Sequence, residues 1–437
     1  MSGGSSAAAL VLATLVLAGC SSASKLLNDV TGENDTILPG KRESIIFPGR
    51  NADAPVTDSK EPIVIPAAQM NASWSQPGGS ASNALGNLAI GSNLARSWAV
   101  SAGDGSSGEG HIIASPIVAN GAIYVLDADG KVTALSANGG ARLWQVSLAP
   151  EGKRHHGAFG GGLAAVEGRV FATTPFSEAL ALDASSGAIV WRKKVGAPIR
   201  AAPTVAEGTI YFTGSSNEVF ALKTSDGSEL WKYQGTGGHA AIVSSTSPAV
   251  SGGLVVMPTT TGEVIAFSAR DGLEAWSDSL ISADPIAAAT NIGGISGRPV
   301  IDEGLVFAIS NAGKLGCYSL MNGERHWAKD ISGSQTPWAA GDFVFLISNG
   351  HTMMAVSKRT GAVRWTAELP GKIWAGPVLG GGRLLAVSSE GKLVSVSAET
   401  GQILTTTDLG GAFYISPVIA GGTVYLLNDD ATLIALK

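Results

Sequence analysis

The sequence has little charge and almost no cysteine. Of its 437 residues only 15% are Asp, Glu, Lys or Arg, and cysteine occurs twice, at Cys20 and Cys317. Two cysteines cannot build the disulfide framework of a small secreted domain. So few charges exclude a coiled coil or a protein of long exposed helices. Nucleic-acid binding requires a basic stripe, but the net charge is −6 and the densest basic run is Arg192-Lys193-Lys194.

Glycine and hydrophobic residues are abundant instead. The chain has 58 glycines and is 45% hydrophobic, enough to bury a sizeable core. Its length allows two or three domains, although β architectures of this size often form one. After the first twenty residues no segment has the spacing of an amphipathic helix. Short apolar runs alternate with Gly, Ser and Asp, which predicts β-strands joined by tight turns.

The N-terminus has the pattern of a bacterial lipoprotein signal. The apolar run from Ala7 to Ala18 is too short to span a bilayer but has the length of a signal-peptide core. It ends in Leu17-Ala18-Gly19-Cys20, which resembles the lipobox, where the peptide is cut before a cysteine that is then acylated. We predict a signal peptide over residues 1–19 and lipidation of Cys20; an ordinary signal peptide or a buried helix is the alternative. Ser21 after the cysteine, rather than Asp, favours the outer membrane.

Residues 20–93 have the composition of a tether. They are rich in Ser, Asn, Pro, Gly and Asp and show no sustained apolar period. Two apolar patches, Ile45-Ile46-Phe47 and Ile63-Val64-Ile65, lie between prolines, and the segment around Trp74 could pack onto a domain. The composition predicts a flexible, lipid-anchored linker.

The rest of the chain is built from a repeat. A glycine followed four residues later by tryptophan occurs six times, ending at Trp144, Trp191, Trp231, Trp276, Trp327 and Trp365. A proline stands 28 residues before five of these tryptophans, and Leu163 takes its place in the second copy. Pro377 and Gly401 mark a seventh unit, with Thr405 at the tryptophan position, and Pro417 begins an eighth. A constant internal spacing with variable joins indicates repeated structural units.

Each unit predicts four short strands. In the third unit they are Pro203–Val205, Thr209–Thr213, Glu218–Lys223 and Glu229–Tyr233, separated by turn residues. Four-stranded units with a period of about 40 residues indicate a β-propeller rather than a solenoid.

The ends of the repeat region complement each other. The eighth unit ends at Lys437 and has room for only three strands, whereas an extra strand around Trp98 precedes the first full unit. That strand can complete the last unit and remove the open edges of the ring. We therefore predict an all-β, eight-bladed propeller over residues 94–437, closed by the N-terminal strand.

The best copy of the repeat, Ala181 to Trp191, resembles the PQQ-type propeller repeat of quinoproteins, Ala-x-Asp-x-x-x-Gly-x-x-x-Trp. The resemblance implies that each indole docks between neighbouring blades and that the glycine permits a tight turn before the outer strand. An indole can bury roughly 150–250 Å². The resemblance thus gives a structural role to Trp98, Trp144, Trp191, Trp231, Trp276, Trp327 and Trp365, and Thr405 is expected to mark the weakest junction.

Catalytic chemistry has little support. Quinoprotein dehydrogenases of this family carry adjacent cysteines, which are absent here, and Cys317 is interpreted as a small buried residue. His155-His156 lacks a metal-ligand spacing, and no helix follows Gly160-Gly161-Gly162 to complete a phosphate cradle. Turn positions hold the candidate carboxylates Asp127, Asp129 and Asp183. We predict no enzyme activity, no cofactor and no metal.

The lipobox, the tether and an eight-bladed PQQ-type propeller together resemble the BamB family. The resemblance implies a non-catalytic scaffold lipoprotein of the outer-membrane β-barrel assembly (BAM) complex, anchored in the outer membrane and facing the periplasm. Its implied partners are BamA, other BAM subunits and unfolded outer-membrane protein precursors. The alternatives are a lipoprotein propeller that binds a small ligand or glycan, and a PQQ-dependent dehydrogenase.

The family's contact with BamA implies two binding loops, 236–247 and 279–298. The apolar run of the first loop falls on Ala240, Ile242 and Val243, and Val243 occupies the position of the family's arginine. The two acidic positions of the second loop hold Gly294 and Ser296. The loops are therefore carried over as regions, and Ile242 is the position to test.

Overall fold

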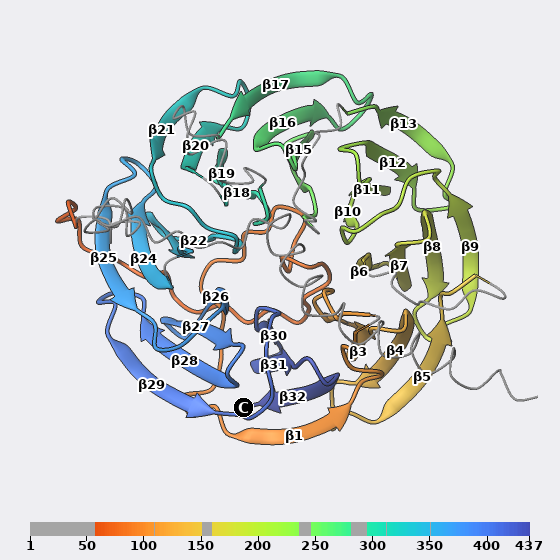
Figure 1. The fold of residues 1–437 in the computed structure, drawn as a ribbon, viewed down its shortest axis with the longest axis horizontal. Coiled ribbons are helices and arrows are strands. Elements are labelled where there is room, and N and C mark those ends of the chain that lie inside the picture. Colours follow the sequence, from red (N-terminus) through yellow and green to blue (C-terminus); the bar gives the residue numbers. More distant parts are fainter. Residues whose placement is uncertain are drawn as a thin grey trace, which may run out of the picture. The chain divides into compact units, whose positions relative to one another are not determined.

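The computed structural model describes residues 57–108, 110–150, 160–235, 246–280, 295–311, 313–349 and 351–437. Within these ranges the regular structure is entirely β: 32 strands form eight four-stranded antiparallel sheets arranged around a common axis (Figure 1). This is the predicted eight-bladed propeller. Among the described residues, no helix has the length and apolar character needed to cross a membrane.

Seven blades consist of four consecutive strands, numbered here from the inner to the outer strand. Blades 1 to 4 are β2 (Ile117–Ala119), β3 (Ala122–Leu126), β4 (Lys131–Ser136), β5 (Arg142–Ser147); β6 (Gly162–Val166), β7 (Arg169–Thr174), β8 (Glu178–Asp183), β9 (Ile189–Lys194); β10 (Thr204–Ala206), β11 (Thr209–Thr213), β12 (Val219–Lys223), β13 (Glu229–Tyr233); and β14 (Ala249–Ser251), β15 (Leu254–Pro258), β16 (Glu263–Ser268), β17 (Glu274–Ser279). Blades 5 to 7 are β18 (Val300–Asp302), β19 (Leu305–Ile309), β20 (Leu315–Ser319), β21 (Arg325–Lys329); β22 (Trp338–Ala340), β23 (Phe343–Ile347), β24 (Thr352–Ser357), β25 (Val363–Glu368); and β26 (Trp374–Gly380), β27 (Arg383–Ser388), β28 (Lys392–Ser397), β29 (Ile403–Asp408).

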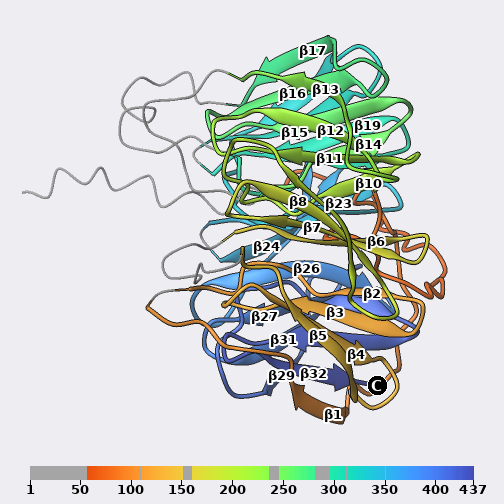
Figure 2. The same cartoon turned by 90° about the vertical axis from the view of Figure 1, so that its right-hand side faces the viewer.

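The burial pattern explains the composition of the strands. The middle strands of a blade are covered on both faces by neighbouring blades, so β3 and β23 are buried at every position and consist of apolar, β-branched and aromatic residues. An outer strand such as β5 alternates between exposed and half-buried residues. Neighbouring blades, seen from the side of the ring in Figure 2, therefore pack their apolar faces together, and one such cluster joins blades 6, 7, 8 and 1.

Blade 8 is closed as predicted. It contains β30 (Val418–Ala420), β31 (Thr423–Leu427), β32 (Thr432–Leu436) and, as its outer strand, β1 (Arg96–Ser101). β1 pairs antiparallel with β32, with Trp98 opposite Ala435. Just before β1, the backbone N–H of Ala95 donates to the carbonyl of Lys437 at 2.8 Å. The N–H of Lys437 donates to the carbonyl of Ala95 at 2.9 Å.

The segment before β1 differs from the expected flexible linker. Residues 57–93 run along the blades and around the centre of the ring in Figure 1, and Trp74 is only 2% exposed. The physical reason is that residues 71–88 form hydrogen bonds to the inner strands of the blades. The folded unit therefore extends N-terminally at least to residue 57 rather than beginning at 94. Residues 1–56, including the predicted signal peptide and Cys20, lie outside the described residues.

Candidate functional site

The tryptophans of the repeat join each blade to the next. In six blades the outer-strand indole donates its N–H to a backbone carbonyl of the following blade, at 2.7–3.1 Å. The acceptor is always the residue just after the third strand, as in Trp231 to Ala269 and Trp276 to Leu320. A buried indole gains both apolar contact and a satisfied N–H from this arrangement. The donors are Trp144, Trp191, Trp231, Trp276, Trp327 and Trp365.

The repeat glycine provides the space for the indole of the preceding blade. Gly272 has a φ of +72°, and a Cβ added there would lie 2.6 Å from two ring carbons of Trp231. A side chain would therefore meet both left-handed backbone strain and a steric clash.

Replacing Gly272 by alanine is expected to lower the free energy of unfolding by about 2–5 kcal/mol, the sum of the backbone and overpacking costs. Gly253→Ala is the matched control, because Gly253 has a φ of +75° but nothing within 4 Å of the added Cβ. Urea unfolding of both variants tests this, and equal losses would contradict a steric role for Gly272.

The eighth junction lacks the tryptophan for a structural reason. The carbonyl that follows the third strand of blade 8 is that of Lys437, and it accepts the backbone N–H of Ala95 at 2.8 Å. The position of the repeat glycine is taken by Leu94, which packs on the core beside the incoming strand. Leu94 thus occupies the space that the repeat glycine leaves for an indole at the other junctions, and all six residues of β29 are exposed.

Cys317 occupies the alanine position of the repeat. It lies on β20 opposite Trp327, as Ala134 lies opposite Trp144 and Ala266 opposite Trp276. Its side chain is fully buried. Burial raises the pKa of the Cys317 thiol to about 12, which suppresses the reactive thiolate.

We therefore expect a Cys20→Ser variant to be unreactive toward Ellman's reagent at pH 8 while folded. Reaction at Cys317 should begin only in denaturant and follow the unfolding transition measured by circular dichroism. Rapid modification of the native protein would contradict the buried position of this thiol.

The carboxylates considered at the sequence level support turns. Asp127 accepts backbone bonds from Asp104, Asp129 and Lys131 at 2.8–3.0 Å, and burial raises the pKa of its carboxyl. Hydrogen bonds from the hydroxyls of Ser185 and Ser186 lower the pKa of Asp183 to about 2. Among the described residues, no group of three or more His, Cys, Asp or Glu side chains could hold a metal. The pair His155-His156 lies outside the described residues.

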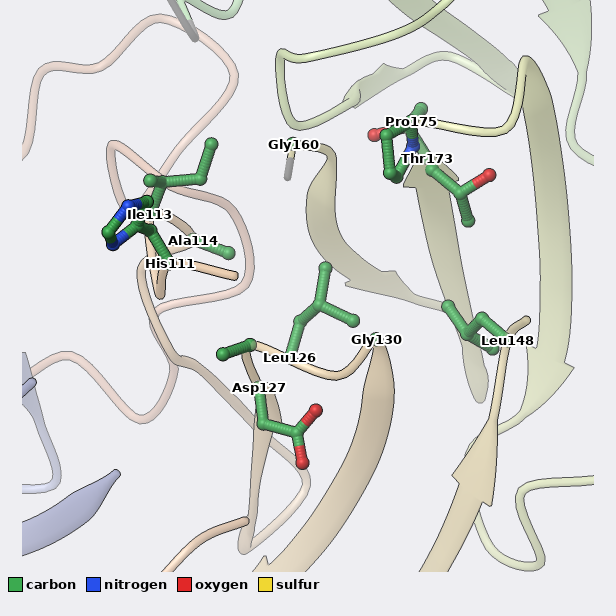
Figure 3. A pocket seen from close by; sticks show the side chains of 12 residues that line it. His111, Ile113, Ala114, Leu126, Asp127, Gly130, Leu148, Gly160, Thr173 and Pro175 are labelled. Atoms are coloured by element: carbon green, nitrogen blue, oxygen red, sulfur yellow. The ribbon is translucent and has the colours of Figure 1, made fainter. Parts of the chain in front are cut away.

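Two cavities contact the described strands. A pocket of about 10 Å³ between blades 1 and 2, lined by His111, Asp127 and Thr173, has room for a single water molecule (Figure 3). A cleft of about 590 Å³ lies where residues 61–64 cross blades 5 and 6. The cations in its lining are already paired, Lys358 with Asp302 and Arg359 with Glu61.

The two predicted partner loops end side by side. Residues 236–245 and 281–294, with Ala240, Ile242 and Val243, lie outside the described residues. Their C-terminal ends are described: the buried hydroxyl of Thr246 donates to the carbonyls of Ile295 and Ser296, at 3.2 and 3.1 Å. Loops far apart in the sequence therefore leave the ring from neighbouring positions.

An arginine without an ion-pair partner among the described residues stands at the end of the second loop. Arg298 precedes the inner strand of blade 5, and its buried Nε has no hydrogen-bond partner among the described residues. Burial lowers the pKa of this guanidinium to about 10. A charge held in this way is costly unless an opposite charge approaches it. No motif in the sequence marks Arg298, because the burial of its Nε depends on packing between blades.

The ring of tryptophan-linked blades defines a PQQ-type, eight-bladed propeller protein. Solved structures share this fold: BamB from Moraxella catarrhalis aligns with a TM-score of 0.69 and 17% identity, covering 79% of this chain and 99% of that one. A europium-containing methanol dehydrogenase aligns with a TM-score of 0.67 and 14% identity, covering 84% and 89%. At such identities the likeness shows the fold alone.

The profile of the family described as outer membrane protein assembly factor BamB matches residues 95–153, 128–367 and 354–437. The chain belongs to the BamB family. Outer membrane protein assembly factor BamB of Salmonella typhimurium is 29% identical over 304 residues, or 67% of this chain and 76% of the relative. The Escherichia coli protein of the same name is 28% identical over 298 residues, with the same coverage.

Proposed function

We propose that this protein is a non-catalytic scaffold of outer-membrane protein assembly, which docks on BamA and aids the folding and insertion of outer-membrane proteins. The observation that carries the proposal is the family match over the whole propeller, from residue 95 to the C-terminus. The relatives named above are outer membrane protein assembly factors. A rigid ring with variable loops suits a scaffold, because loops can change without disturbing the stacked blades.

We place the docking surface on the two loops, 236–247 and 279–298. The Thr246 bonds to Ile295 and Ser296 support this assignment, because they put the ends of both loops next to each other. Two neighbouring loops can contact one partner domain together. Ile242 contributes the apolar contact in this proposal.

Arg298 supplies the charge that the family's arginine position lacks. Val243 stands at that position, so the first loop offers no cation there. Arg298 lies at the end of the second loop, and its Nε has no partner in the part of the chain that the structure describes. An acidic side chain of BamA would pair with this guanidinium and form a charge-assisted hydrogen bond with its Nε.

The location follows from the predicted lipid anchor. Several acyl chains on Cys20 would hold the protein firmly, since one chain gives only marginal binding and each buried CH₂ adds about 0.8 kcal/mol. With Ser21 after the cysteine, we propose that the protein is anchored in the outer membrane and faces the periplasm. Palmitate labelling of the wild-type protein and of Cys20→Ser tests the anchor.

Co-purification tests the scaffold role. The protein is expressed with its native N-terminus in its own host, the envelope is solubilised in mild detergent, and bound proteins are identified by mass spectrometry. We expect BamA to be recovered. Ile242→Arg should reduce the recovery about tenfold or more, because a charge in an apolar contact costs at least 1–3 kcal/mol. Arg298→Gln should reduce it as well.

Leu273→Arg is the matched control. Leu273 is 69% exposed and lies before β17, so an arginine there should leave recovery unchanged. If the wild-type protein is isolated without BamA, the scaffold proposal fails, and a ligand-binding propeller becomes the better explanation.

A further inference from the structure

Residues 71–88 reach the inner strand of every blade. They follow the ring in order, so that each successive contact falls on the next blade. The contacts run from Asn71 on β30 through Trp74 on β2, Ser75 on β6, Gln76 on β10, Ala81 on β14, Ser82 on β18, Gly86 on β22 and Leu88 on β26. In Figure 1 the corresponding trace passes around the centre of the ring.

These contacts are made mainly through the main chain. Trp74 and Val118 exchange two backbone bonds of 2.8 Å, and Leu88 bonds to both Leu379 and Gly381. The carbonyls of Ala81 and Ser82 accept from the inner strands of blades 4 and 5 at 2.7 and 2.9 Å. In five blades the bonded residue is the middle one of a three-residue strand: Val118, Val205, Val250, Ile301 and Ile419.

Amide side chains replace the main chain where the segment bends. The buried amide of Gln76 donates to the carbonyl of Val205 at 2.9 Å and accepts from its N–H at 2.8 Å. Asn83 donates to the carbonyl of Pro299 at 2.8 Å. A side-chain amide has an N–H donor and a C=O acceptor like those of a peptide bond. These side chains can therefore bond to the inner strands in the way the main chain does.

One aromatic side chain anchors the segment. The ring of Trp74 stacks on Trp338 with centroids 5.9 Å apart and an interplanar angle of 17°. The indole of Trp338 donates to the carbonyl of Gly86 at 2.8 Å. From Pro62 to Ala95 the sequence contains no Asp, Glu, Lys or Arg. The rim therefore binds a segment without charge.

We infer that the inner rim of the propeller, the edge formed by the inner strands of the eight blades, is a binding site for an uncharged polypeptide that curves around the ring, and that residues 69–88 are its resident ligand. An inner strand is the edge of its blade, with N–H and C=O groups directed at the axis. Leaving such a buried group unpaired is unfavourable, because it loses its hydrogen bonds to water and gains none in the protein. The segment pairs groups of this kind on seven blades and receives the Trp338 indole bond from the eighth. Recognition through main-chain hydrogen bonds depends on the path of the bound backbone more than on its side chains.

Hydrogen exchange of the full-length protein tests this site. Seven of the backbone amides that donate to the segment serve as probes: Val118, Ala165, Val205, Val250, Ile301, Gly381 and Gly421. In the variant Trp74→Ala with Gln76→Ala, we expect their exchange to rise together by about tenfold or more, since both the anchor and the bidentate amide are lost. Amides of β5 and β9 should not change.

Adding a synthetic peptide of residues 68–89 in excess should restore the protection of the seven amides in this variant. Met70→Ala is the control, because Met70 is 66% exposed on the same segment. In this control variant the seven amides should exchange at the wild-type rate. If the double variant does not fold, Gln76→Ala alone is used. The inference is overturned if the rim amides stay protected in the variant, or if they exchange faster and the peptide does not restore them.

Discussion

Replacing Trp276 by alanine is expected to lower the free energy of unfolding by about 3–5 kcal/mol. Its side chain is only 7% exposed, and its indole donates to the carbonyl of Leu320 at 2.7 Å. It also stacks on Tyr318, with ring centroids 5.9 Å apart. The substitution leaves a cavity between blades 4 and 5 and a buried carbonyl without its donor. Guanidinium unfolding followed by circular dichroism measures the loss.

The chain contains its own control for this change. Thr405 stands at the same position of the repeat on the fully exposed strand β29, so Thr405→Ala should change stability by no more than about 0.5 kcal/mol. If the two alanine variants lose similar amounts, the indole does not hold the blades together.

Ending the chain at Ala431 is expected to abolish cooperative folding. The truncation removes β32, whose Leu433, Ile434 and Leu436 are at most 3% exposed. Burial of each contributes about 1.5–3 kcal/mol, and β1 and β31 both lose their pairing partner. The total approaches the whole stability of a typical domain, about 5–15 kcal/mol. The truncated protein should lack a sigmoidal melting curve and be degraded rapidly by a protease.

Removing only Lys437 is the milder comparison. It deletes the two backbone bonds with Ala95 but leaves β32 paired with β1. This variant should still melt cooperatively, at a slightly lower temperature. A cooperative transition in the protein that ends at Ala431 would show that closure through β1 is dispensable.

The blades could be predicted because their information is local and repeated. Each unit carries its own proline, glycine and tryptophan at fixed spacing, and the strands expected in the third unit match β10 to β13 within one or two residues. The closure of the ring could also be predicted from the sequence, because the final unit lacks one strand and the residues around Trp98 can supply it.

The path of residues 69–88 along the inner strands could not be predicted in the same way. Their bonding partners are backbone groups of seven blades and the indole of Trp338, up to 348 residues away, as for Asn71 and Ile419. Backbone groups leave no pattern in the sequence of either side. Two signals were present nonetheless: the absence of charge from Pro62 to Ala95 and the single Trp74 within it. A solvated linker has no need of either feature.

The pairing of the first strand with the last affects the order in which the molecule can assemble during synthesis. Residues 69–101 leave the ribosome before any blade is complete, yet β1 needs β32 and Asn71 needs β30. Until the final residues are made, β1 remains an unpaired strand and the early segment lacks several of its partners. Contacts so distant in sequence slow folding and prolong the exposure of open edges. A nascent chain of this protein therefore has a particular need for protection from aggregation until its last strand is released.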